Sequence, residues 1–188
     1  MSARDEILAA LRAAAPEARE LPDLSRFKPP RPGFDLRERF EKSVVEVGGR
    51  LARSFGEVPE FAAARRIVSL VPGIAGNVDL AAVRDPHQLS DLDFCVVPAV
   101  LGVAENGACW IADHGGANRA ACFLAQHIGV VVSAASLAHD LHEAYERLQL
   151  PSPGFAMFLS GPSKTADIEQ ALVIGAHGAR SCTVVITL

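Results

Sequence analysis

Hydrophobic residues along the chain alternate between short apolar runs, typical of buried strands, and stripes at helical spacing. The runs predict strands at Arg50–Arg53, Arg66–Val71, Phe94–Val97, Ala108–Ala112, Ile128–Ser133, Phe155–Leu159 and Cys182–Thr187. The stripes predict helices at Pro59–Ala64, Leu137–Leu148 and Asp167–His177. Because short apolar strands between helices are typical of buried parallel sheets, we expect an α/β fold, with a largely parallel sheet covered on both faces.

The first part of the chain differs from this pattern. A capping-box pattern begins at Ser2 and precedes a short apolar stripe, which predicts an exposed helix. Residues 16–32 are rich in proline and lack periodicity, so they are expected to form an extended arm. Asp35 is the predicted N-cap of the helix that follows. The sequence thus divides into an N-terminal helix and Pro-rich arm, residues 1–34, and an α/β domain, residues 35–188.

Length and charge narrow the possible functions. A chain of 188 residues suits one domain with a small appendage. A net charge of -4 gives no basic footprint, so nucleic acid is not an expected partner. The N-terminus lacks the uninterrupted apolar core of a signal peptide, and no later run reaches membrane-spanning length. We therefore expect a cytoplasmic protein without membrane insertion. Residues 73–93 are expected to be a surface connection with at most a short helix.

The four cysteines form no C-x-x-C pair and lie in apolar surroundings, where thiols are usually small buried hydrophobes. They are Cys95, Cys109, Cys122 and Cys182. Asp113 and His114 precede two glycines, which favours a loop over a metal site. No iron–sulfur cluster or metal is expected in this chain, and the sequence leaves any other cofactor unknown.

The polar run from Ser160 to Glu169 follows a predicted strand, where ligands bind in open α/β sheets. Thr165 could be the N-cap of the predicted helix, with both carboxylates of the run in the first turn. Alternatively, backbone amides beside Lys164 could hold a phosphate or carboxylate, contacted mainly by Ser163 and Lys164. The run contains no P-loop. The candidate ligand-binding residues here are Ser160, Gly161, Ser163, Lys164, Thr165, Asp167 and Glu169.

Two further motifs carry candidate chemistry. Glu105 precedes Asn106-Gly107, a strong turn signal between two strand-like runs, so the segment predicts a hairpin turn with a solvated glutamate. The same carboxylate could serve as nucleophile or general base, which makes Glu105 the candidate catalytic residue. Asn106 and Gly107 are candidate ligand contacts. His177-Gly178 would close the helix after the polar run, with Gly178 at C′. His177 is also a candidate ligand contact.

Together these motifs resemble the LUD-domain family, and specifically its lactate-utilisation protein C branch. The resemblance rests on Gly102–Gly107, Gln126–Val131, Ser160–Glu169 and Gly175–Gly178. It implies a Rossmann-like fold similar to the sugar-phosphate isomerase and CoA-transferase group. It also implies a cytoplasmic subunit of a system that oxidises L-lactate to pyruvate. In that system, partner proteins would carry the iron–sulfur clusters, and this chain would bind a small carboxylic acid through Lys164 or support assembly.

Two alternatives remain open at the level of sequence. Asn106 stands where the family usually has threonine, which makes the turn resemble the S-E-N-G motif of class I CoA transferases. That similarity implies a stand-alone enzyme acting on acyl-CoA or sugar phosphates, with Glu105 as nucleophile or base. The other alternative is a non-catalytic scaffold or regulatory module whose N-terminal helix and arm engage a partner.

Overall fold

The computed structural model describes residues 2–17, 19–20, 22–23, 33, 35–112, 115–149, 154–168 and 171–188. The chain divides into two units, Met1–Pro32 and Gly33–Leu188. In the first unit, helix α1 (Ala3–Ala13) begins at the predicted capping box, in which the Asp5 N–H donates to Ser2 Oγ. None of its residues is buried. The arm predicted for residues 16–32 lies mostly outside the described residues.

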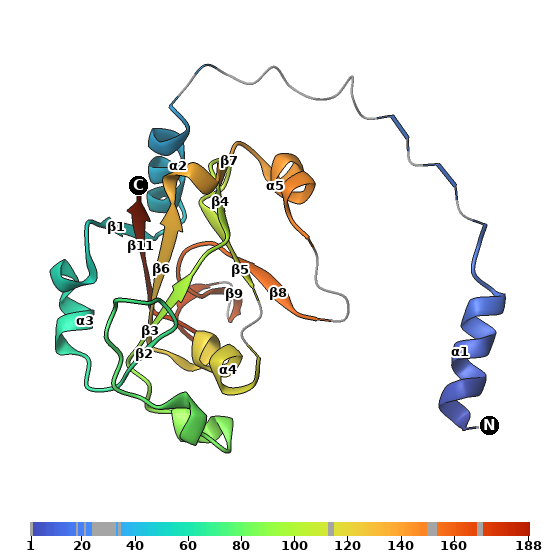
Figure 1. Ribbon diagram of the computed structural model, residues 1–188, viewed down its shortest axis with the longest axis horizontal. Coiled ribbons are helices and arrows are strands. Elements are labelled where there is room, and N and C mark those ends of the chain that lie inside the picture. Colours follow the sequence, from blue (N-terminus) through green and yellow to red (C-terminus); the bar gives the residue numbers. More distant parts are fainter. Residues whose placement is uncertain are drawn as a thin grey trace. The chain divides into compact units, whose positions relative to one another are not determined.

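A five-stranded parallel sheet forms the centre of the second unit (Figure 1). Its strands, in spatial order, are β1 (Arg50–Ala52), β11 (Ser181–Thr187), β6 (His127–Ser133), β3 (Phe94–Pro98) and β2 (Ile67–Ser69). Every neighbouring pair is parallel. The chain crosses from β1 at one edge to β2 at the other and then returns strand by strand. This arrangement confirms the predicted α/β fold with a Rossmann-like, largely parallel sheet.

The direction of these connections decides which helices cover which face. Because strand crossovers are right-handed, connections that run in opposite directions lie on opposite faces of the sheet. The β1-to-β2 connection contains α3 (Pro59–Ala63), which lies on one side of the sheet in Figure 1. The other face is covered by α4 (Gly116–Leu124) and α2 (Leu36–Glu46). Helices therefore cover both faces, as predicted.

Alternate residues of each parallel strand line two separate cores. On the α3 face, Phe55, Phe94 and Val96 pack with Phe61. On the opposite face, Phe40 of α2 belongs to a larger cluster that also includes alternate residues of β3, β6 and β11. Alternation along a strand thus places one set of side chains under α3 and the other under α2 and α4.

A second, four-stranded sheet was not anticipated from the sequence. Its order is β7 (Leu137–Ala138), β4 (Leu101–Val103), β5 (Ala108–Ala112) and β8 (Ala156–Leu159). Strands β4 and β7 are too short to give a clear hydrophobic pattern. The helix predicted at Leu137–Leu148 is shorter, because its first residues form β7 and helix α5 covers only Leu141–Arg147. Trp110 of β5 and Phe158 of β8 pack edge to face, with ring centroids 4.6 Å apart, in the core beneath α5.

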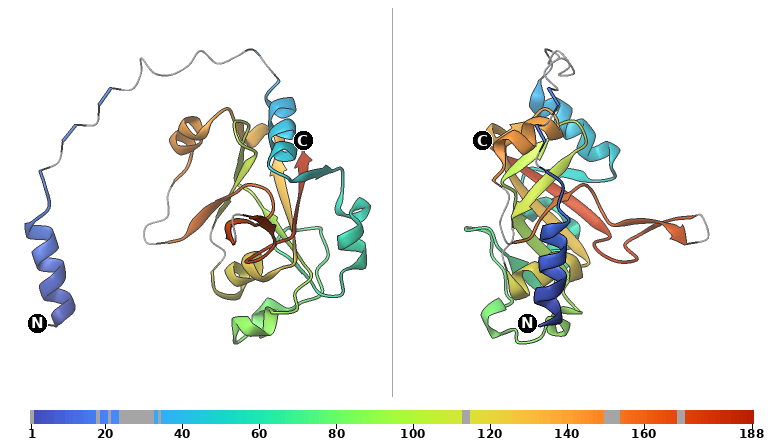
Figure 2. Two further views of the ribbon diagram at one scale, coloured as in Figure 1. Left: turned by 180° about the vertical axis from the view of Figure 1, so that it is seen from behind. Right: turned by 90° about the vertical axis from the view of Figure 1, so that its right-hand side faces the viewer.

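Two helix assignments were wrong. The helix predicted at Asp167–His177 is instead a hairpin of β9 (Lys164–Ile168) and β10 (Ala171–Ile174). The right-hand view of Figure 2 shows this hairpin projecting from the rest of its unit. Helix α4 was missed, because Gly115 and Gly116 at its start have positive φ and were interpreted as a turn. Residues 73–93 contain two short 3-10 helices, Leu80–Ala82 and Pro86–Leu89, where at most one short helix was expected.

Candidate functional site

The Ala104–Gly107 turn and the Ser160–Lys164 loop meet beside α2. The turn joins antiparallel strands β4 and β5, as the hairpin prediction required. Ser160 Oγ donates a hydrogen bond to the Asn106 carbonyl oxygen at 2.9 Å, which links the two motifs directly. Ser43 Oγ of α2 donates to the Ala104 carbonyl at 2.7 Å. Segments more than fifty residues apart in sequence are therefore held together at one place.

The C-terminal end of α2 fixes the position of the Ser160–Lys164 loop. Gly161 has a positive φ of 70°, and a Cβ there would lie 2.4 Å from the Val47 carbonyl oxygen, so only glycine fits. The Lys164 ammonium donates to the same carbonyl oxygen. Carbonyls at a helix C-terminus carry partial negative charge, which favours a cation at this place. The loop is thus anchored by one close backbone approach and one charge-assisted contact.

The segment after β10 also packs against this loop. The Ser163 N–H donates to the Ala179 carbonyl at 2.8 Å, and the Gly175 N–H donates to the Ser163 carbonyl at 2.9 Å. A Cβ on Gly178 would lie 3.2 Å from Ser163 Cβ. His177 is exposed in the same segment. It does not end a helix, so the helix-terminus interpretation of His177-Gly178 was wrong. The loop nevertheless contacts both other motifs, the turn through Ser160 and the segment after β10 through Ser163.

Glu105 occupies the tip of the β4–β5 turn and is exposed. Its Oε2 accepts the Leu141 N–H at 3.2 Å, at the first residue of α5, and its carbonyl accepts a hydrogen bond from Arg39 Nη2 at 3.4 Å. The neighbouring Asn106 Oδ1 accepts the Ala108 N–H at 3.1 Å. The Glu105 carboxylate therefore satisfies an orphan donor at a helix N-terminus, a structural role that the sequence did not suggest.

The remaining candidates lie along β9. Thr165 is opposite Val173 of β10 and is not a helix N-cap, so the capping interpretation of this run was wrong. Asp167 lies on the same strand, and Glu169 lies outside the described residues. In the described part of the chain, the Ser163 and Thr165 hydroxyls make no hydrogen bond. These hydroxyls and the ammonium protons of Lys164 that Val47 does not use can serve a small anion.

Sequence reasoning did not find a cavity of about 690 Å³ on the α3 face of the parallel sheet. It lies where β1, β2, β6 and β11 end. Its lining is Arg53, Ser54, Phe55, Gly56, Phe61, Ile67, Val71, Pro72, Gly73, Ile74, Ala75, Gly76, Asn77, Val131, Val185 and Thr187. The available signal was positional: residues just after parallel strands, such as Arg53 directly after β1 and Val71 two positions after β2, line crevices in open α/β folds.

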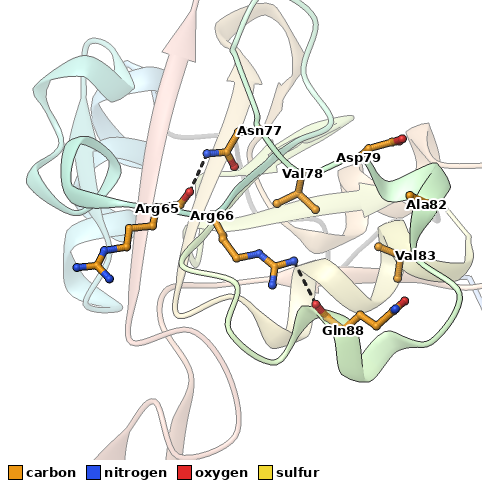
Figure 3. A pocket seen from close by; sticks show the side chains of 8 residues that line it. All are labelled: Arg65, Arg66, Asn77, Val78, Asp79, Ala82, Val83 and Gln88. Atoms are coloured by element: carbon orange, nitrogen blue, oxygen red, sulfur yellow. Dashed lines mark hydrogen bonds between the residues drawn. The ribbon is translucent and has the colours of Figure 1, made fainter.

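A second pocket, of about 440 Å³, lies beside the first and is lined by the residues in Figure 3. Arg66 Nη2 donates to the Gln88 carbonyl at 3.1 Å, and the same guanidinium pairs with Asp91. Asn77 Nδ2 donates to the Arg65 carbonyl at 2.7 Å, while the Arg65 side chain points away from the other labelled residues (Figure 3). The polar groups of Arg66 and Asn77 are thus engaged in holding β2 and the following loop.

A polar network lies on the α3 face at the opposite end of the strands. Arg50 Nε donates to Thr183 Oγ1 at 2.8 Å, and its Nη2 lies 2.5 Å from Glu60 Oε2. His127 Nδ1 and Ser181 Oγ are 2.8 Å apart. The hydrogen bond from Arg50 lowers the pKa of Glu60, and burial lowers the pKa of His127. These groups hold β1, β6, β11 and α3 in register.

The cysteines are buried, as predicted. Burial raises the pKa of Cys182 to about 12 and that of Cys109 still further, so these thiols stay protonated. Among the described residues, no group of three or more His, Cys, Asp or Glu side chains could hold a metal ion. The helices of the described part are too short or too polar to cross a membrane.

Comparison with known proteins shows the family and the fold to which the chain is similar. The LUD domain family matches residues 63–187, which include the cavity loop, the β4–β5 turn and the β9–β10 hairpin. The crystal structure of a DUF162 family protein from Deinococcus radiodurans is similar, with a TM-score of 0.55 and 16% sequence identity over 80% of this chain and 95% of that one. At this identity the likeness concerns the fold. No curated protein matches the chain. Since the family match spans most of its length, the chain belongs to the LUD-domain family.

Proposed function

We propose that this chain is a cytoplasmic subunit of an L-lactate utilisation system. In that system L-lactate is oxidised to pyruvate together with iron–sulfur partner proteins, and this chain binds a small carboxylic acid or supports assembly. Membership of the LUD-domain family, which is associated with lactate utilisation, supports the proposal. The lactate-utilisation protein C branch is the part of the family whose motifs the chain resembles.

One contact carries the proposal, the hydrogen bond between Ser160 Oγ and the Asn106 carbonyl. It joins two of the four motifs on which the resemblance rests, and a third packs on Ser163 through Gly178. Separate caps and turns would have no reason to meet at one place. Around this junction, the Lys164 ammonium would pair with the carboxylate of a small acid and the Ser163 hydroxyl would hydrogen-bond it.

The adjacent hairpin supports a role in assembly. Leu172 and Ile174 of β10 are 64% and 54% exposed, and Ile174 pairs with Lys164 in the hairpin register. An isolated two-stranded hairpin is only marginally stable in water, so a protein surface against it would stabilise it. Because this apolar strand is continuous with the proposed acid site, an iron–sulfur partner is the occupant that the proposal assigns to it.

The test uses the tagged full chain in lactate-grown cells of its source. Recovery of partners that contain iron and labile sulfide, together with lactate-oxidising activity, would support the proposal. We expect Lys164→Ala with Ser163→Ala to abolish lactate-dependent growth while retaining the partners. Leu172→Ser with Ile174→Ser should release the partners. Lys42→Ala, a change at an exposed lysine of α2, is the matched control and should leave growth and recovery unchanged.

Two outcomes would overturn the proposal. The first is an iron-free eluate without lactate-oxidising activity from the wild-type protein. The second is full rescue of growth on lactate by both double variants, since the junction and hairpin would then carry no function. Thermal unfolding of each variant separates a loss of function from a loss of fold.

A further inference from the structure

We propose that the cavity on the α3 face is a second binding site, for a monocarboxylate with an apolar body of medium length. This site goes beyond the proposed function, because the junction of the LUD motifs packs against α2, on the opposite face of the parallel sheet. The argument rests on the position of the cavity, its walls and the charge at its rim.

The position is the one at which open α/β sheets bind ligands. From β1 the chain leaves across the α3 face; after β2 it first packs Val71 and Ile74 on that face, and from Val78 onward it returns across the other face. The crevice outside the carboxyl ends of the strands at such a reversal is the usual ligand site. Arg53 and Ser54 directly follow β1, Thr187 ends β11, and Val71 follows β2 by two positions.

The walls are mainly apolar. They are formed by rings above the sheet and aliphatic side chains on the sheet and loop, namely Phe55, Phe61, Val71, Ile74, Val131 and Val185. A volume of about 690 Å³ lies within the range of small-molecule sites. In the loop wall from Val71 to Asn77, Gly73 and Ala75 carry little or no side chain, and a Cβ on Gly73 would meet nothing within 4 Å.

The rim of the cavity carries the guanidinium of Arg53 and the hydroxyl of Ser54. In the described part of the chain, the guanidinium of Arg53 makes no hydrogen bond or ion pair. Ser54 is the N-cap of the 3-10 helix Phe55–Glu57, yet its hydroxyl makes no capping bond. Glu57 accepts the Arg53 backbone N–H at 3.4 Å but does not line the cavity. Arg53 and Ser54 can therefore both donate to a carboxylate at the rim.

These features select a class of ligand. Lactate and pyruvate have no apolar body to fill the cavity, and a sugar phosphate would place its hydroxyls against aromatic and aliphatic walls without hydrogen-bond partners. A carboxylate with a chain of several methylenes matches both parts: its head reaches Arg53 and Ser54, and its chain is removed from water between Phe55 and Val131.

The test titrates octanoate into the full chain, with binding followed by calorimetry and by NMR of methyl groups. We expect octanoate to shift the methyl signals of Ile74 and Val131 and to leave that of Ile128, on the other face, unchanged. Arg53→Gln should weaken octanoate binding about tenfold, one lost charge-assisted contact. It should not alter the weaker binding of 1-octanol, which has no charge.

Matched variants make the result specific. Arg84 is exposed and lines neither this cavity nor the neighbouring pocket. Arg84→Gln should therefore leave octanoate affinity unchanged. Ala75→Phe should fill the cavity and remove binding. Lys164→Ala should leave octanoate affinity unchanged, because Lys164 belongs to the proposed acid site and not to this cavity. Absence of octanoate binding, or equal binding by the wild-type protein and the Arg53→Gln and Ala75→Phe variants, would overturn the inference.

Discussion

Gly129 lies beneath the ring of Phe55 in the middle of β6. A Cβ at this position would be 2.4 Å from Phe55 Cε1, closer than any real contact. Glycine usually weakens a strand, but here its missing side chain admits an aromatic ring to the sheet. Phe55 in turn packs against Phe61 and Phe94, with ring centroids 5.7 and 5.9 Å away. One small residue thus sets the position of the whole aromatic cluster under α3.

We expect Gly129→Ala to lower the free energy of unfolding by about 1–3 kcal/mol, because the core must move to admit a methyl group. The measurement is urea unfolding of the variant. Gly33→Ala is the control, since a Cβ there would meet nothing within 4 Å. Phe55→Leu in the Gly129→Ala background should cost less than Phe55→Leu alone. A loss no larger than that of the control would contradict the close approach.

Glu105 provides a second prediction at this scale. Glu105→Gln keeps an oxygen that can accept the Leu141 N–H, whereas Glu105→Ala removes the acceptor. We expect Ala to cost about 0.5–1 kcal/mol and Gln less, judged by chemical denaturation. Both variants should support growth on lactate if the residue only caps α5. Loss of growth in the stable Gln variant would instead favour the enzyme hypothesis, in which Glu105 is the nucleophile or base.

At the scale of elements, the parallel strands were predictable and the β9–β10 hairpin was not. The strands β3, β6 and β11 carry apolar residues on both faces, which gives runs of two or three consecutive valine and isoleucine residues of the kind that buried parallel strands show. In the hairpin, Ile168, Ala171, Leu172 and Gly175 happen to match helical spacing. The β-branched Val173 and Ile174 were the contrary signal, because such residues favour strands.

The candidate site shows a similar limit. Turn chemistry predicted the Ala104–Gly107 hairpin, since Asn-Gly favours tight turns. The sequence could not show that Ser160 reaches the Asn106 carbonyl, because that contact depends on how β5 pairs with β8. Nor could it show the cavity, whose walls come from strands distant in sequence. Local patterns predict elements, whereas pairing and packing decide which side chains meet.

The attachment of the Ser160–Lys164 loop to α2 predicts a difference between two glycines. Gly161 and Gly115 both have φ of 70°, so alanine at either position pays a similar backbone cost. At Gly161 the added Cβ would also meet the Val47 carbonyl oxygen, while at Gly115 it would meet nothing within 4 Å. We expect Gly161→Ala to lower the melting temperature clearly more than Gly115→Ala does. Equal melting temperatures would mean that the loop does not rest on α2.

For the whole molecule, the polar network under α3 makes stability depend on pH. The pKa of His127 lies below its usual 6.5 mainly because burial disfavours the charged form. A histidine with a lowered pKa stabilises the fold fully above pH 6.5 and less as the pH falls through that value toward the folded pKa. The pKa of Glu60 is also lowered, so its contribution is lost only below its usual 4.5.

His127 and Glu60 affect stability in different pH ranges, so their contributions can be measured separately. Between about pH 7.5 and pH 5 we expect the urea midpoint of the wild-type protein to fall, and that of His127→Gln to fall less. Gln removes the titrating group and can still hydrogen-bond Ser181. Parallel curves for the two proteins would show that burial of the imidazole does not control acid sensitivity in this range.

The place of β11 in the sheet has a consequence for the order of folding. This strand follows all other described strands in sequence, yet it lies between β1 and β6 and pairs with both. Until it is made, β1 has no neighbour and one edge of β6 is open. A nascent chain therefore carries an incomplete sheet with exposed backbone donors until β11 is made. Such long-range pairing slows folding and leaves the early chain dependent on protection from aggregation.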